Sequence, residues 1–112
     1  MTTQPKGVTD PLQLALDAVV AEWPDVNAKQ IFGHRGYVRT GKMFGYLADD
    51  GVSVKLTSAM DADEVMSRDG VTAVQHHGEK PTKGWATLPL RNDADLDAAV
   101  DLLHRAYETV AR

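Results

Sequence analysis

Residues 40 to 56 read TGKMFGYLADDGVSVKL, and the second half of this stretch decides the fold class. Val52, Val54 and Leu56 are apolar, and the residues between them are polar or charged. Alternation with a period of two is typical of a β-strand that buries one face and exposes the other to water. The sequence therefore predicts an antiparallel sheet with one buried and one solvated side.

Two turn signals divide this part of the chain into short strands. Thr40-Gly41 and Asp49-Asp50-Gly51 carry the residue types that tight hairpin turns prefer. Two hairpins in succession form an antiparallel meander. The strands predicted on this basis are 31–40, 42–48 and 51–57.

Helical patterns lie on both sides of the meander. The first helix begins at Asp10 as N-cap, with Pro11 at its first position and Gln13 placed to complete a capping box. A shorter helix is predicted after Ser58, and a long amphipathic helix is capped by Asn92 or Asp93. The apolar stripe predicted for the first helix is Leu12, Leu16, Val19, Val20 and Trp23.

Two further strands are predicted at 71–75 and 85–90, joined by QHHGEKPTKGW at residues 75–85. Because Pro89 cannot donate a hydrogen bond, we expect the last strand to lie at an edge of the sheet. The order α-β-β-β-α-β-β-α predicts an α+β fold in two layers: a five-stranded antiparallel sheet covered by helices on one face. The second face then stays open to solvent, to a ligand or to a second copy of the chain.

Length and composition indicate one ordinary globular unit. A chain of 112 residues has room for a single core, so we predict a flexible arm at residues 1–9 and one domain at 10–112. It contains no cysteine, which excludes a disulfide framework. The sequence has no apolar run of ~20 residues, and its start lacks the apolar core of a signal peptide. We therefore expect a soluble, cytoplasmic protein with no membrane partner.

Charge is distributed unevenly along the chain. The formal net charge of −4 argues against a dedicated nucleic-acid binder, because such proteins are usually basic. However, the segment from Val26 to Ala48 has no acidic residue, and its basic residues include Lys29, Arg35, Arg39 and Lys42. Runs of charge are more often simply solvated, but this one predicts a basic side through which an acidic protein could approach DNA.

The stretch QHHGEKPTKGW could be interpreted as a metal-binding site or as an anion-binding site. His76 and His77 are adjacent, so in a strand they point to opposite faces, and we predict no metal site and no cofactor. Lys80 and Lys83 could instead grip a phosphate backbone, with Trp85 stacking or packing beneath them. The alternative is that these lysines only keep an exposed turn soluble.

Catalytic patterns are not recognised in the sequence. Tyr37, Tyr46 and Ser53 have no general base at a characteristic spacing, and no glycine-rich phosphate loop opens a helix. We therefore predict no catalytic residue and a protein that is not an enzyme.

Three segments resemble a known group of small domains. TGKMFGYLADDGVSVKL, GEKPTKGWATLPL at 78–90 and LLHRAYETVAR at 102–112 are similar to the TfoX N-terminal and MmcQ/YjbR-like families. The resemblance implies a secretion-chaperone-like α+β fold, and DNA-binding or regulatory roles that rest on analogy. The chain has no counterpart of the second, helical TfoX domain, so a role that needs that domain is not expected.

The sequence as a whole predicts a non-enzymatic binding module with a weak DNA-binding or regulatory role. The alternative is a protein-interaction or dimerisation module that uses the open sheet face or the Pro89 edge strand. The residues predicted to contact nucleic acid or another anion are Arg35, Arg39, Lys42, Lys80, Lys83 and Trp85.

Overall fold

The computed structural model describes residues 9–31, 33–49, 51–58, 60–75 and 81–110. The predicted N-terminal arm, apart from Thr9, and the histidine pair at 76–77 lie outside these ranges. The described elements, in chain order, are α1 (Pro11–Val20), β1 (Val26–Ile31), β2 (His34–Arg39), β3 (Lys42–Leu47), β4 (Gly51–Lys55), α2 (Ala62–Met66), β5 (Thr72–Gln75), β6 (Pro81–Pro89) and α3 (Asp93–Val110).

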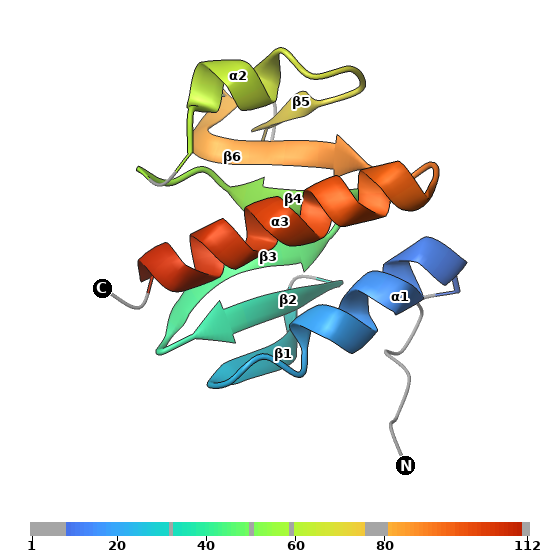
Figure 1. Cartoon of the computed structure of the whole chain (residues 1–112). Coiled ribbons are helices and arrows are strands. Elements are labelled where there is room, and N and C mark those ends of the chain that lie inside the picture. The colour runs from blue at the N-terminus through green and yellow to red at the C-terminus, as the bar shows by residue number, and fades with distance from the viewer. Residues whose placement is uncertain (1–8, 32, 50, 59, 76–80, 111–112) are drawn as a thin grey trace.

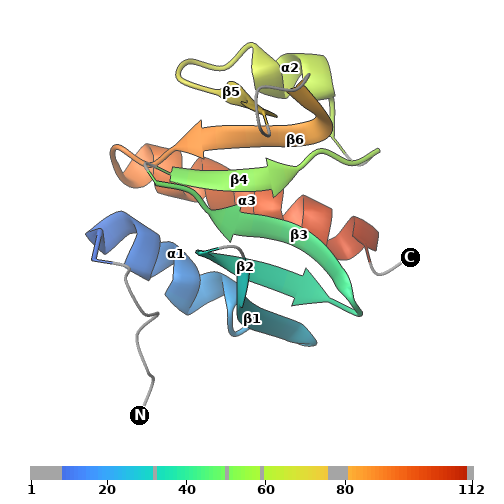
Figure 2. The same cartoon turned by 180° about the vertical axis from the view of Figure 1, so that it is seen from behind.

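The strands form one antiparallel sheet in the order β1-β2-β3-β4-β6-β5. Figure 1 shows α1 and α3 lying side by side across one face of this sheet, with α2 at the end that carries β5. Seen from behind, in Figure 2, strands β1 to β4 and β6 have no helix in front of them. The predicted α+β class, with helices over one face, is therefore confirmed.

The sheet has six strands among the described residues, and not the five predicted. The strand that the sequence missed is β1, VNAKQI, which is an edge strand and pairs only with β2. An edge strand buries little, and the inward side of β1 carries only Val26 and Ala28, both half-buried, as an apolar signal. Gly33, at φ +81°, lies in the turn that separates β1 from β2, so the predicted strand 31–40 spanned a hairpin turn.

Strand β6 lies between β4 and β5, so the prediction that the last strand is an edge is wrong. Pro89 is tolerated in this inner strand because β5 is short and its first residue, Thr72, pairs with Thr87. Pro89 extends beyond that pair and is matched only with Gly51 of β4. Its missing N–H therefore costs no ladder hydrogen bond on the β5 side.

Helix α1 begins as predicted, but its inward face is partly polar. The Asp10 carboxylate accepts a hydrogen bond from the Gln13 backbone N–H at 2.9 Å. The Gln13 side chain, which the sequence places to complete a capping box, instead donates from Nε2 to the carbonyls of Ala48 and Gly51 at 2.6 and 2.8 Å. Val19, assigned to the apolar stripe, is 44% exposed. The buried residues of α1 are Gln13, Leu16, Asp17 and Val20.

The other two helices begin at side-chain caps. Asp61, and not Ser58, caps α2 by accepting from the Glu64 N–H at 3.2 Å. At the start of α3 the Asn92 side-chain oxygen accepts from the Asp95 N–H at 2.9 Å, as predicted. These bonds satisfy N–H groups that have no partner within the first turn.

The core lies between the sheet and the pair α1 and α3. Gly45 of β3 allows α3 to approach closely, because a Cβ at this position would collide with the Leu103 side chain. The residues of the core with no more than 1% exposure include Leu16, Val20, Tyr37, Phe44, Val52, Val54, Val65, Ala86, Leu102, Leu103 and Ala106. Among the described residues, no helix is both long and apolar enough to cross a membrane.

Candidate functional site

The two faces of the sheet can be assigned from the pairing of the strands. Tyr37 contacts Asp17 of α1 and therefore points to the helix-covered face. Its neighbour Gly36 belongs to the opposite face, because successive strand residues alternate. Gly36 pairs with Tyr46, Tyr46 with Ser53, and Ser53 with Thr87. These partners share the side of the sheet that the helices leave open, which we call the helix-free face.

Three aromatic side chains form a row across the helix-free face. The ring centroids of His34 and Tyr46 lie 5.6 Å apart with an interplanar angle of 52°. Those of Tyr46 and Trp85 also lie 5.6 Å apart, with an angle of 44°. The rings come from β2, β3 and β6, and all three residues are half-buried. We call His34, Tyr46 and Trp85 the aromatic row.

Hydrogen bonds hold the positions around the aromatic row. The His34 ring lies with Nδ1 3.0 Å from the Leu47 carbonyl, which can only accept, so this nitrogen carries the proton. Ser53, which pairs with Tyr46, is fully buried, and its hydroxyl lies 2.8 Å from that of Thr87. This hydroxyl pair joins β4 to β6 on the same face and gives the buried Ser53 hydroxyl a hydrogen-bond partner.

The charge of the helix-free face is opposite to that of the chain as a whole. Lys55 pairs with Trp85 and Lys29 pairs with Gly36, so both lysines belong to this face. Among the described strand positions of the face, none carries a carboxylate. These positions include Asn27, Lys29, His34, Gly36, Val38, Met43, Tyr46, Gly51, Ser53, Lys55, Thr72, Trp85, Thr87 and Pro89.

Arg35, predicted to contact a phosphate, is engaged inside the protein. Its Nε donates to Asp17 Oδ1 at 2.6 Å, and a second nitrogen donates to Oδ2 at 3.4 Å. The Tyr37 hydroxyl donates to the same carboxylate at 2.8 Å. Burial, and then the hydrogen bond to Asp17, raise the pKa of Tyr37 well above its usual range. This cluster joins α1 to β2 and turns Arg35 toward the helices.

Arg39 is also used within the fold. Its guanidinium carbon lies 3.8 Å from the centroid of the Tyr107 ring, and Nη1 donates to the Tyr107 carbonyl at 2.9 Å. The Nε of Arg39 is buried without a hydrogen-bond partner in the described structure. Lys42 is exposed and pairs with Arg39 at the end of the β2–β3 hairpin, on the side of the helices.

The structure therefore does not place Arg35 and Arg39 on one surface with Trp85. Trp85 lies on the helix-free face, beside Tyr46 and His34, which the sequence interpretation did not include. Lys80 and the side chain of Lys83 lie outside the described residues, so their predicted contacts stay predictions. His34 and Tyr46 could be found only through the strand register, because they are far from Trp85 in the sequence.

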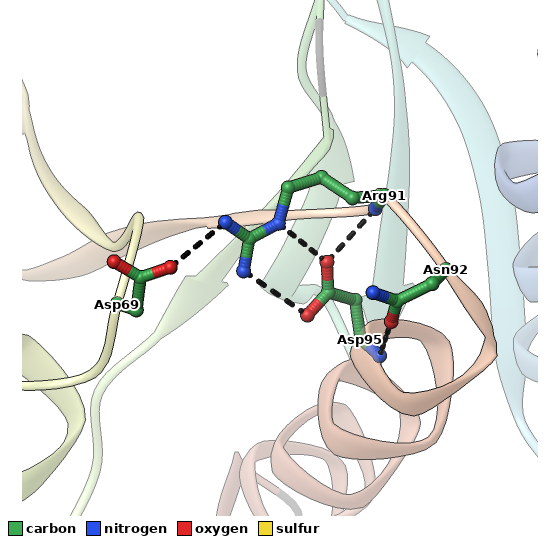
Figure 3. A network of polar contacts seen from close by, with 4 residues as sticks. All are labelled: Asp69, Arg91, Asn92 and Asp95. Atoms are coloured by element: carbon green, nitrogen blue, oxygen red, sulfur yellow. Dashed lines mark hydrogen bonds and ion pairs between the residues drawn. The ribbon is translucent and has the colours of Figure 1, made fainter.

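A second polar cluster surrounds Arg91 (Figure 3). Its Nε and backbone N–H donate to Asp95 Oδ2 at 2.8 and 2.9 Å, and Nη1 donates to Asp69 at 2.9 Å. These bonds raise the pKa of Arg91 and lower that of Asp95, in both cases mainly through the side-chain hydrogen bond between them. They tie the start of α3 to the segment that follows α2, which is a structural role.

The cavity next to this cluster is too small for an organic ligand. Its volume is about 60 Å³, and its lining includes Arg68, Asp69, Val71 and Leu88. A water molecule occupies about 30 Å³ in the liquid, whereas pockets for small molecules measure about 300–1,000 Å³. Within the described ranges, no group of three or more histidine, aspartate or glutamate side chains could hold a metal ion.

Comparison with known proteins identifies the family. The family model described as the Luciferase domain matches residues 41–106, which is more than half of the chain, and the protein belongs to this family. The membership agrees with the resemblance to the MmcQ/YjbR-like group, whereas the TfoX N-terminal name is not confirmed. Neither a curated protein nor a solved structure matches the chain. The matched range contains Tyr46, Lys55 and Trp85 and leaves out α1, β1 and β2.

Proposed function

We propose that this protein is a non-enzymatic module that binds single-stranded nucleic acid, weakly, on the helix-free face of its sheet. The observation that carries the proposal is the aromatic row, His34, Tyr46 and Trp85, on a face whose described charges are lysines. Because membership of a family fixes a fold and not the chemistry of a site, the function is argued from the site.

Stacking would supply most of the affinity. A base that lies on an aromatic side chain gains about 1–3 kcal/mol, and every base offers such a face. Three rings therefore offer roughly 3–9 kcal/mol before the cost of association, which corresponds to micromolar binding or weaker. A duplex hides the faces of its bases in its own stack, so a single strand is the form that fits these rings.

Electrostatics favour the same ligand. Lys55 lies beside Trp85 in the strand register, where its ammonium can reach the phosphates of a strand stacked on the row. Lys29 extends the positive charge toward β1. Of the residues predicted from the sequence, the proposed site retains Trp85. Arg35 and Arg39 are not part of it, because their guanidinium groups are engaged with Asp17 and Tyr107.

The environments of two hydroxyl groups support binding rather than catalysis. The Tyr37 hydroxyl donates to Asp17 inside the core, where burial also raises its pKa. The Ser53 hydroxyl is buried against Thr87. A nucleophile or general acid must reach the reacting group, and neither hydroxyl faces solvent in this arrangement.

A second copy of the chain is a poorer occupant of the same face. A two-fold symmetric interface on this face would bury Lys29 and Lys55 of both copies, and its described strand positions offer no carboxylate to pair with them. The buried centre of a stable dimer interface is also depleted of charged residues, whereas this face carries two lysines. Among the described residues, Val19 on α1 is the large apolar side chain with high exposure, and it lies in the helix layer.

The proposal is tested by fluorescence anisotropy with a labelled single-stranded DNA of mixed sequence and about ten nucleotides. We expect micromolar binding at ~50 mM salt that weakens at ~200 mM, and weaker binding of the matching duplex. Trp85→Ala should weaken binding about tenfold, the equivalent of one stacked base.

A matched pair of charge reversals locates the surface. Lys55→Glu should weaken binding and reduce the salt slope by about one, whereas Lys42→Glu makes the same charge change on the helix side and should leave both nearly unchanged. Circular dichroism verifies that each variant is folded. Absence of binding at low salt, or equal effects of the two reversals, would overturn the proposal. Self-association that is insensitive to salt would favour the dimer instead.

A further inference from the structure

We infer that the helix-free face selects pyrimidine-rich single strands over purine-rich ones, because its rings hold neighbouring bases apart. This inference rests on the proposed function and specifies the class of strand that the site accepts. It follows from the spacing and the tilt of the aromatic row.

The spacing of the rings is greater than the spacing of stacked bases. Each neighbouring pair in the row has its centroids 5.6 Å apart. Consecutive bases in a stacked strand rise by about 3.4 Å. A strand whose successive bases lie on His34, Tyr46 and Trp85 must therefore open the gap between each base and the next.

The tilt of the rings has the same consequence. The planes of His34 and Tyr46 differ by 52°, and those of Tyr46 and Trp85 by 44°. Bases stacked on one another are parallel, whereas bases that lie flat on these rings would be inclined by similar angles. A bound strand therefore exchanges its base–base stacking for stacking on the protein.

The geometry of the row is held by the sheet and cannot easily adapt to a stacked strand. Tyr46 is fixed in register against Gly36 and Ser53, and the Ser53 hydroxyl is bonded to Thr87 of β6, two residues from Trp85. The His34 ring is held by its Nδ1 contact with the Leu47 carbonyl. The rings are also in contact with one another, so a shift of one requires a shift of the next.

The exchange of base–base stacking for stacking on the protein costs less for pyrimidines than for purines. Purine runs have large ring surfaces and stack strongly along the free strand, whereas runs of thymine stack weakly and have a flexible backbone. Preferences of single-strand binders arise from such differences in stacking strength and flexibility. Since two base–base steps must open on three rings, we expect oligo-dT to bind about tenfold more tightly than oligo-dA of the same length.

The test is an anisotropy titration with labelled oligo-dT and oligo-dA, both about nine nucleotides long, at ~50 mM salt. The ratio of the two dissociation constants is the readout. Tyr46→Ala removes the central ring, which imposes both tilts, and should reduce this ratio toward one as well as weaken binding. Tyr46→Phe keeps the ring and should preserve the ratio.

A temperature series gives a second measurement on the unaltered protein. Warming weakens the self-stacking of oligo-dA, so the advantage of oligo-dT should narrow as the temperature rises within the folded range. Equal affinities at low temperature, or tighter binding of oligo-dA, would overturn the inference and leave the proposed function standing. Failure of both strands to bind would instead refute the proposed function itself.

Discussion

Replacing Tyr37 with phenylalanine should destabilise the fold more than the same change at either of the other two tyrosines. The ring of Tyr37 is fully buried, and its hydroxyl donates at 2.8 Å to Asp17, which is 5% exposed. Removing the hydroxyl leaves this carboxylate with Arg35 as its remaining partner among the described side chains. A hydrogen bond to a charged group contributes about 1.5–3 kcal/mol, so the free energy of unfolding should fall by that amount.

The other tyrosines provide a graded comparison, since the substitution is chemically identical. The Tyr107 hydroxyl donates at 2.8 Å to the Pro24 carbonyl, which is neutral, so Tyr107→Phe should cost about 0.5–1.5 kcal/mol. Tyr46 lies half-buried on the helix-free face, and Tyr46→Phe should change stability by less than about 0.5 kcal/mol. The expected order of destabilisation is therefore Tyr37, Tyr107 and Tyr46.

Urea unfolding followed by circular dichroism measures these differences. With a slope of about 1–3 kcal/mol/M for a small protein, the Tyr37→Phe midpoint should fall by roughly 1 M. The raised pKa of Tyr37 adds a pH signature: its stabilisation is complete below the ordinary tyrosine pKa of about 10 and is lost as the pH rises above it. The gap between wild type and Tyr37→Phe should therefore narrow in alkali. An effect at Tyr46 as large as that at Tyr37 would refute this account of the Asp17 cluster.

Two further predictions concern the Arg91 cluster and the glycines. Because Arg91 lowers the pKa of Asp95, the stabilisation by Asp95 is complete above the ordinary aspartate pKa of about 3.9 and is lost as the pH falls below it. Asp95→Asn should therefore lower the melting temperature at neutral pH and leave it unchanged in strong acid. Gly51→Ala should cost at least ~1–3 kcal/mol in urea unfolding, because its Cβ would collide with the backbone of Leu88. Gly41, at φ +82°, has open space around it, so Gly41→Ala should cost only the ~1–2 kcal/mol of a left-handed backbone, and a larger loss there than at Gly51 would contradict the steric argument.

Much of the fold could be predicted from the sequence because its signals are local. The alternation of Val52 and Val54 gives the strand, Asp10 and Pro11 give the helix start, and the glycine turns give the hairpins. The errors arise where tertiary context decides. Strand β1 has too little apolar surface to be recognised, and the position of β6 in the sheet depends on the pairing of β5, which residue types do not specify.

The candidate site was harder to predict, since it depends on which residues meet across strands. Trp85 was found as a tryptophan near lysines, but its contact with Tyr46 depends on the pairing of β3, β4 and β6. Arg35 and Arg39 were assigned to a basic surface because they are positively charged and have no acid near them in the sequence. Arg35 and Arg39 each lie two residues from Tyr37 along β2. Because alternate strand residues share a face, both point toward the helices, as Tyr37 does.

Net charge is also a poor guide to this protein, because its charges are divided between its two layers. The exposed acids of α3 are Asp93, Asp97, Asp101 and Glu108, whereas Lys29 and Lys55 belong to the helix-free face. An α-helix with its side chains is about 10–12 Å across, which exceeds the Debye length of about 8 Å at physiological ionic strength. A nucleic-acid strand bound on the helix-free face is therefore largely screened from the acidic side chains of α3. It interacts mainly with the nearby lysines. A net charge of −4 is thus compatible with binding of a polyanion, provided that the anion approaches the sheet and not the helices.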